Sequence, residues 1–139
     1  MNDSGTVITN TIKSKGSVLL DEIVGQQYEM QPELNERYGP SGREKCLQDA
    51  QYTLSYLMQA LEFSSSTLFT DYAVWLKVLL TGLGIPEKDI TFNLDTIKYV
   101  LGKELPPDAN TLLSEYIHMA VNTVKSTSKE IPTFIDQNG

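Results

Sequence analysis

Apolar residues recur every three or four positions along most of this chain, which is the spacing that gathers side chains on one face of an α-helix. The segment 17–30 carries Leu19, Leu20, Ile23 and Val24 on one side. The segment 86–102 has a narrower stripe, made of Ile90, Leu94, Ile97 and Leu101. Alternation by two, which is the pattern of a strand, is far weaker. The pattern therefore predicts an all-α fold.

Proline, glycine and capping residues predict where these helices begin and end. The first clear helix ends before Pro32, and Gly39-Pro40 then breaks the chain. Ser41 and Glu44 have the spacing of a capping box, so a long helix should start at Ser41. Later breaks predict helices after the loop 64–67, from Pro86 to Gly102, and from Pro107 to about Lys125. We expect a five- to six-helix orthogonal bundle, or a globin-like arrangement of such helices.

The two ends of the chain have weaker patterns. Residues 1–16 hold few apolar positions, and Thr9, Asn10 and Thr11 are indifferent helix formers, so we expect a flexible arm or a short helix there. The predicted helical domain covers residues 17–125. Residues 126–139 are expected to be a tail or linker toward a C-terminal module.

The predicted helix 41–63 is apolar on two sides. One stripe contains Leu47, Ala50, Leu54, Leu57, Met58 and Leu61, and the opposite side contains Tyr52, Tyr56 and Phe63. A helix at the edge of a bundle needs only one apolar side. The helix is therefore either sandwiched in the centre of the bundle or exposes Tyr52, Tyr56 and Phe63 at a subunit interface.

The following segment is the richest in large apolar side chains. Phe69, Tyr72 and Trp75 lie within it, among several leucines. These three residues are the candidate lining of a pocket for haem or another apolar small molecule.

Charge and composition narrow the classes of partner. The 139 residues include 11 Lys or Arg and 18 Asp or Glu, so the net charge is −7 and nucleic acid or an anionic membrane would repel the chain. No apolar run approaches the roughly 20 residues that span a bilayer, and no signal peptide is recognisable. We expect a cytoplasmic protein that binds neither nucleic acid nor membrane.

No catalytic or metal-binding motif stands out. His118 is the only histidine and falls on the polar side of its predicted helix, which favours a solvated surface residue over a ligand or pH sensor. Cys46 is the only cysteine and is expected to be a small buried or half-buried hydrophobic residue rather than a redox-sensing thiol. Carboxylates such as those of Glu87 and Asp89 are expected on solvated helix surfaces. We predict no enzyme activity and no cofactor.

Several short motifs between Gln31 and Pro86 resemble the helical N-terminal region of bacterial cobalamin-binding regulatory proteins. They include Gln31-Pro32-Glu33-Leu34, Arg37-Tyr38-Gly39, Arg43-Glu44-Lys45-Cys46-Leu47 and Trp75-Leu76. A looser similarity in helix pattern links the chain to haem-free globin-like domains of stress-signalling regulators.

The resemblance implies a sensor or dimerisation domain that precedes a cobalamin-binding module. It does not imply cobalamin binding by these residues, because the Asp-x-His-x-x-Gly signature of that module is absent and Thr53 precedes Leu54 where such proteins often have histidine. The leading hypothesis is a non-catalytic regulatory domain of a bacterial signalling or transcription-regulating protein, acting as a homodimer or through contact with a C-terminal output module. The alternative is a globin-like sensor of haem or another apolar molecule.

Overall fold

The computed structural model of the protein describes residues 3–127. Within that range it forms five helices and no strand. They are α1 (Asp3–Met30), α2 (Glu33–Glu62), α3 (Ser66–Gly82), α4 (Glu87–Gly102) and α5 (Pro107–Ser126). The expected all-α fold is confirmed as a five-helix bundle, whereas a globin-like topology is not.

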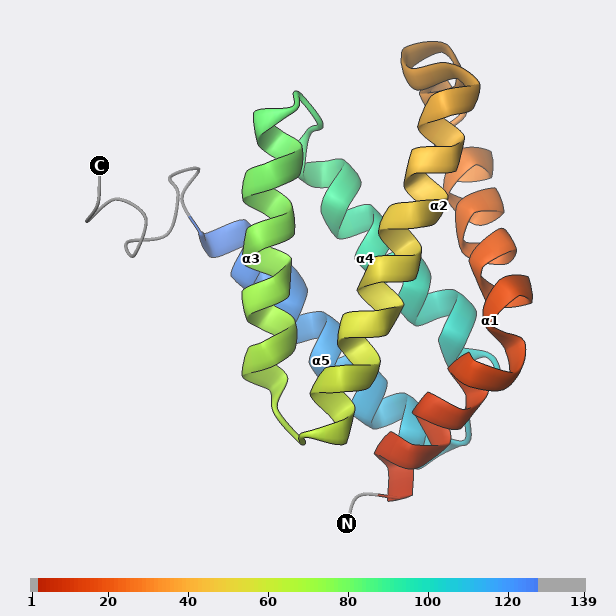
Figure 1. Ribbon diagram of the computed structural model, residues 1–139, viewed down its shortest axis with the longest axis vertical. Coiled ribbons are helices and arrows are strands. Elements are labelled where there is room, and N and C mark those ends of the chain that lie inside the picture. Colours follow the sequence, from red (N-terminus) through yellow and green to blue (C-terminus); the bar gives the residue numbers. More distant parts are fainter. Residues whose placement is uncertain (1–2, 128–139) are drawn as a thin grey trace.

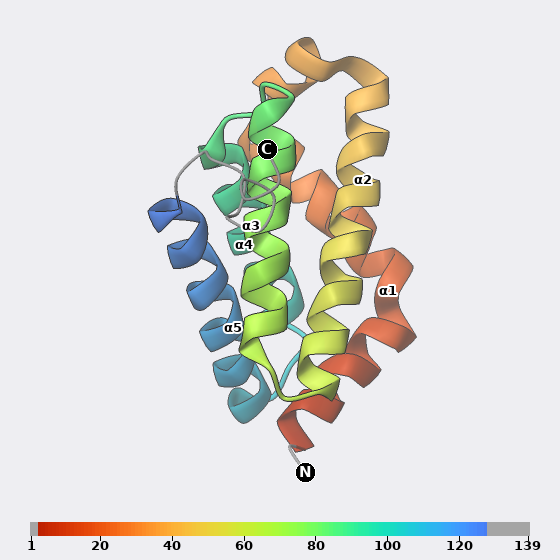
Figure 2. The same cartoon turned by 60° about the vertical axis from the view of Figure 1, so that its left-hand side comes forward.

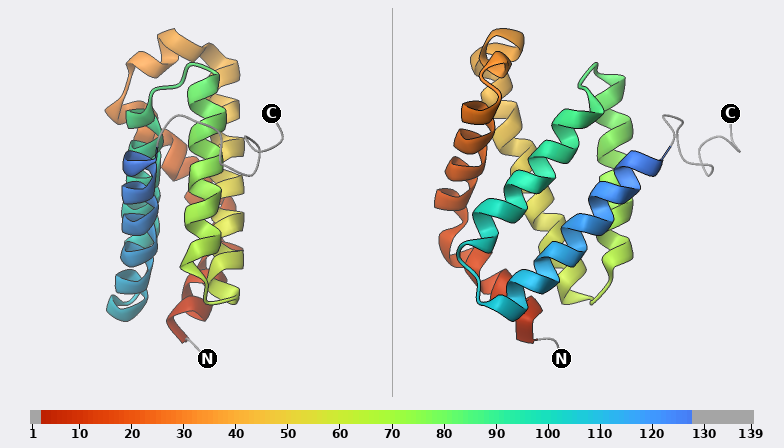
Figure 3. Two further views of the ribbon diagram at one scale, coloured as in Figure 1. Left: turned by 90° about the vertical axis from the view of Figure 1, so that its left-hand side faces the viewer. Right: turned by 180° about the vertical axis from the view of Figure 1, so that it is seen from behind.

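The helices form two layers. α2 and α3 run antiparallel in one layer, and α4 and α5 form the other (Figure 1). α1 lies along one edge and packs on both α2 and α4 (Figure 2). Seen from the side, the outer face of the α2–α3 layer is not covered by any other helix of the described range (Figure 3). None of these helices combines the length and the apolar character needed to cross a membrane.

The main cluster of buried hydrophobic residues joins all five helices. Each helix contributes at least one side chain with no exposed surface, namely Ile8, Leu57, Phe69, Leu94 and Ile117. Complete burial of such a side chain stabilises a fold by about 1.5–3 kcal/mol. The stripe predicted on α4 is confirmed, since all four of its residues belong to this cluster.

A smaller, second cluster is formed where α1 ends and α2 begins. Val24, Tyr28 and Leu34 are its buried members. Tyr38, Cys46 and Leu47 are partly buried against them. The kinked first turns of α2 therefore have a separate hydrophobic centre.

Of the flexible arm or short helix expected over residues 1–16, the structure has a helix from Asp3, although not a separate short one. Residues 3–16 are continuous with the rest of α1, and Ile8 and Ile12 are buried in the main cluster. Burial of these two side chains outweighs the weak helix propensity of the threonines and asparagine between them. At the other end, residues 128–139 of the expected tail lie outside the described residues.

The start of α2 agrees with the predicted break at Gly39-Pro40 but not with the predicted capping box. The helix begins at Glu33 and is interrupted at Gly39, whose φ of 66° and ψ of −165° suit a residue without Cβ. Ser41 makes no side-chain hydrogen bond to any residue between 3 and 127, so the predicted capping box does not form. The cap predicted before α3 is present, because Ser65 Oγ accepts a hydrogen bond from the Leu68 amide at 3.4 Å.

Candidate functional site

The aromatic side of α2 is exposed to solvent. The exposed fractions are 60% for Tyr52, 41% for Tyr56 and 69% for Phe63, while Leu54 and Leu57 on the other side are buried. Successive residues of a helix are turned by about 100°, so Tyr52, Tyr56 and Phe63 project within one narrow sector. The sequence left open whether this side is sandwiched inside the bundle or exposed. In the structure it is exposed.

α3 continues this apolar surface. Leu68, Trp75 and Leu79 are exposed, and their spacing puts them on one side of the helix. Ring contacts join the two helices, since Tyr56 stacks on Tyr72 with centroids 4.4 Å apart and Tyr72 lies 6.0 Å from Trp75. We call this surface the α2–α3 face. Its exposed members are Tyr52, Tyr56, Phe63, Leu68, Trp75 and Leu79.

The pocket expected at Phe69, Tyr72 and Trp75 is not formed by these residues. Phe69 and Tyr72 are buried in the main cluster, and Trp75 is 56% exposed. The Tyr72 hydroxyl lies 2.8 Å from Thr53 Oγ1, and burial raises the pKa of Tyr72 to about 12. None of the three lines the cavity of about 120 Å³ described below, or the cavity of about 510 Å³ between the start of α1 and the end of α2. Phe69, Tyr72 and Trp75 therefore connect the core to the α2–α3 face instead of enclosing a ligand.

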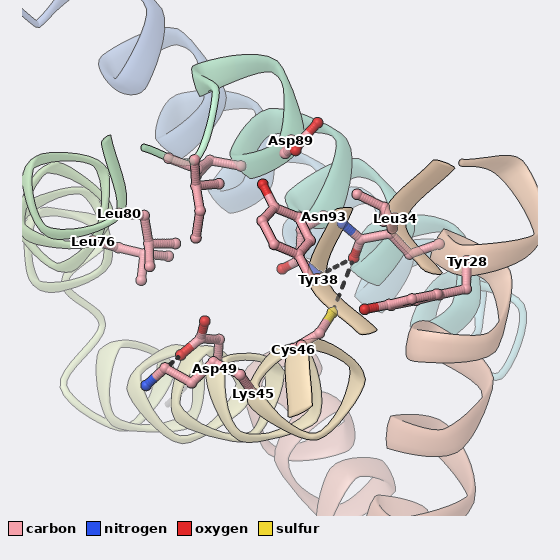
Figure 4. A pocket seen from close by; sticks show the side chains of 14 residues that line it. Tyr28, Leu34, Tyr38, Lys45, Cys46, Asp49, Leu76, Leu80, Asp89 and Asn93 are labelled. Carbon is pink, nitrogen blue, oxygen red and sulfur yellow. Dashed lines mark hydrogen bonds and ion pairs between the residues drawn. The ribbon is translucent and has the colours of Figure 1, made fainter. Parts of the chain in front are cut away.

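A cavity of about 120 Å³ lies between the main cluster and the second cluster. Leu76, Leu80 and Ile90 form its wall on the side of the main cluster. The opposite wall contains Tyr28, Leu34, Tyr38 and Cys46 of the second cluster, and the side chains converge on the space between (Figure 4). The walls are mostly apolar.

One edge of the cavity carries a small polar network. Gln27, which is 5% exposed, accepts hydrogen bonds at Oε1 from Asn93 Nδ2 at 2.7 Å and from Cys46 Sγ at 3.5 Å. Burial, with a smaller contribution from the nearby Asp49 carboxylate, raises the pKa of Cys46 to about 11. The thiol is therefore protonated at neutral pH and is a poor nucleophile.

A partly buried ion pair joins the start of α4 to the first turns of α2, next to the cavity, with Asp89 buried and Arg37 36% exposed. Asp89 is 5% exposed, which corrects the expectation of a solvated surface carboxylate. Its oxygens accept hydrogen bonds from Gln31 Nε2 at 3.1 Å and from Arg37 Nη1 at 3.0 Å. Gly42 allows close packing here, because a Cβ on it would lie 2.1 Å from Tyr38 Cβ. Periodicity could not reveal this site, since the partners are more than 50 residues apart.

Lys77 is a second buried charge that the sequence pattern did not reveal. Its side chain is 2% exposed, and Nζ donates to the carbonyl oxygens of Val124, at 2.6 Å, and Thr127. The same ammonium pairs with Glu87 Oε1 at 2.9 Å. A cation is favourable at this position, because the carbonyl groups at the end of α5 carry partial negative charge. Lys77 thus links α3 to the end of α5.

The remaining candidates do not meet in one site. His118 is exposed on α5, where its Nε2 lies 3.1 Å from Asn122 Nδ2. Cys46 is half-buried in α2, as expected. No group of three or more histidine, cysteine or acidic side chains within residues 3–127 could hold a metal ion. The chain matches no model of a known protein family, and a search of curated proteins finds no match.

Proposed function

We propose that this chain is a non-catalytic regulatory domain that self-associates through the α2–α3 face. The observation that carries the proposal is the exposed aromatic surface on one side of two adjacent helices. Monomeric proteins rarely expose large contiguous apolar surfaces, and tyrosine, tryptophan and phenylalanine are enriched at subunit interfaces. A two-fold axis would place this face against the same face of a second copy.

The contacts of α3 suggest how association would reach a C-terminal output module. Trp75 and Leu79 belong to the α2–α3 face, and Lys77 lies between them in the same helix. Because Lys77 holds the last carbonyl groups of α5, a shift of α3 on dimerisation would alter the position at which the chain leaves α5. The resemblance to the N-terminal region of bacterial cobalamin-binding regulators agrees with this role.

The alternative of a haem sensor has less support. Pockets for drug-sized ligands occupy about 300–1,000 Å³ and are mostly apolar. The cavity between the clusters has only about 120 Å³, and the cavity of about 510 Å³ between α1 and the end of α2 is lined mainly by polar side chains such as Thr9, Asn10 and Gln59. The only histidine is exposed on α5 and lines neither cavity. We therefore favour the self-associating regulatory domain.

Sedimentation velocity from low to high micromolar protein would test self-association. We expect the unmodified chain to form dimers, and the double variant Tyr52→Glu, Trp75→Glu to weaken the association at least about tenfold. Association should also strengthen with salt, because each copy carries a net charge of −7. The matched control is Tyr99→Glu, which changes an exposed tyrosine of α4 outside the face.

Circular dichroism of each variant would establish that the helices remain folded. A monomer at high micromolar concentration would contradict the proposal. So would a Tyr99→Glu variant that dissociates as readily as the double variant, because the interface would then involve α4.

A further inference from the structure

We propose that the cavity between the main cluster and the second cluster is a binding site for a small neutral aromatic molecule that carries one hydrogen-bonding group, of the size of phenol. This proposal is independent of self-association through the α2–α3 face. It rests on the position, the size and the polar edge of the cavity.

The cavity lies between the two hydrophobic clusters and separates them. Leu76 and Leu80 of α3 face it from the main cluster, and Tyr28 and Leu34 face it from the second cluster (Figure 4). An apolar molecule between them would give both walls the contacts that they lack. Close packing is the rule in protein interiors, so a gap between two apolar walls is a favourable place for an apolar ligand.

The size of the cavity limits the ligand to about one ring. An apolar cavity of about 150 Å³ in another protein accommodates benzene, and the cavity here has about 120 Å³. A single six-membered ring fits this space, whereas a tetrapyrrole does not. The charges near the wall are also paired, Asp49 with Lys45 at 3.8 Å and Asp89 with Arg37 at 3.0 Å. Paired charges favour a neutral ligand over an ionic one.

The polar edge supplies the hydrogen-bonding groups. The bond from Asn93 Nδ2 to Gln27 Oε1 uses one donor and one acceptor of the two amides. Gln27 Nε2 and Asn93 Oδ1 form no hydrogen bond within residues 3–127, and both residues line the cavity. Gln31 Oε1 is the only fully buried side-chain polar atom without a partner in that range, so Gln27 Nε2 and Asn93 Oδ1 remain accessible. If both side-chain amides were rotated by 180°, one free donor and one free acceptor would still remain. A hydroxyl group can use both, which is why we infer a phenol-like molecule and not a pure hydrocarbon.

Isothermal titration calorimetry with phenol, benzene and benzoate would test the site. We expect saturable binding of phenol with a dissociation constant of about 1 mM or tighter, weaker binding of benzene, and no binding of the benzoate anion. The absence of saturable phenol binding would overturn the proposal. Equal binding of benzoate would overturn the assignment of a neutral ligand.

Two variants distinguish this cavity from binding elsewhere on the protein. Cys46→Met extends a side chain into the cavity and should weaken phenol binding at least about tenfold. Asn93→Leu removes the acceptor and should abolish the preference for phenol over benzene. Val18→Met, at an exposed position of α1, is the control and should bind phenol like the unmodified chain. Unchanged binding by Cys46→Met would overturn the proposal.

A measurement on the unmodified chain avoids dependence on the folding of any variant. Phenol should shift the backbone amide resonances of Gln27, Cys46 and Asn93, in an ¹⁵N–¹H correlation spectrum, more than those of α5. Shifts centred on α5 or on the α2–α3 face would overturn the assignment. The double variant Tyr52→Glu, Trp75→Glu should keep phenol binding, so the failure of self-association and the failure of this site are distinguishable.

Discussion

The main cluster draws fully buried side chains from all five helices, whereas the second cluster has only Val24, Tyr28 and Leu34 as buried members. The main cluster is held chiefly by apolar packing, with the buried hydrogen bond between Tyr72 and Thr53 as a polar contact inside it. The region of the second cluster depends also on the Arg37–Asp89 ion pair and on the amides of Gln27 and Gln31. Such polar contacts contribute modest net stability compared with extensive apolar burial. The comparison indicates that the main cluster supplies most of the stability, whereas the region of the second cluster can adapt to a ligand.

The largest contrast should come from truncating one large side chain in each cluster. Phe69→Ala in the main cluster should lower the free energy of unfolding by about 3–5 kcal/mol, and Leu34→Ala in the second cluster by about 2 kcal/mol. Phe69 has no exposed surface and packs on Tyr72, so its removal leaves a cavity that the surrounding helices cannot fill. Urea unfolding followed by circular dichroism measures both values. Equal losses would contradict the division into a stabilising and an adaptable region.

A smaller effect is expected from breaking the partly buried ion pair between Arg37 and Asp89. Asp89→Ala should cost about 1–3 kcal/mol, because Arg37 and Gln31 lose their hydrogen-bond acceptor. Hydrogen exchange should accelerate in residues 31–47 and remain slow in α5. Asp95→Ala, at an exposed position of α4, is the matched control and should change neither measurement. Uniformly faster exchange in all five helices would show that the second cluster does not open separately.

Features that depend on spacing within a single helix could be predicted from the sequence. The stripe of Ile90, Leu94, Ile97 and Leu101 lies where periodicity places it, because these residues face a core that extends along the whole of α4. Spacing likewise places Tyr52, Tyr56 and Phe63 on one side of α2, although the sequence leaves open whether that side is sandwiched between helices or exposed. Both features depend on spacing within one helix, which a sequence displays directly.

The cavity and the buried charges could not be predicted, since they depend on residues far apart in the chain. Asp89 meets Gln31 and Arg37 only because the end of α1 and the start of α2 fold over α4. Lys77 is buried because it reaches the end of α5, almost 50 residues later. In residues 3–16 the helix propensity of the sequence is weak. Packing of Ile8 and Ile12 nevertheless stabilises a helix there.

At neutral pH the smallest effect on stability is that of Cys46, which belongs to the second cluster and has no charge at that pH. Its pKa is about 11 in the folded chain, against 9.0 for an unperturbed thiol. The folded state therefore holds the proton more tightly than the unfolded state. The resulting contribution to stability is complete below pH 9 and is lost as the pH rises through 11.

The rate of alkylation by iodoacetamide provides a direct measurement, because only the thiolate reacts. In the folded chain the rate should rise about tenfold for each pH unit between pH 8 and pH 10, without levelling near pH 9. The same chain in concentrated urea is the control, and its rate should level near pH 9. A plateau near pH 9 in the folded chain would mean that water reaches the thiol freely. The second cluster would then be open on the side of the proposed ligand site, and phenol should bind there only weakly.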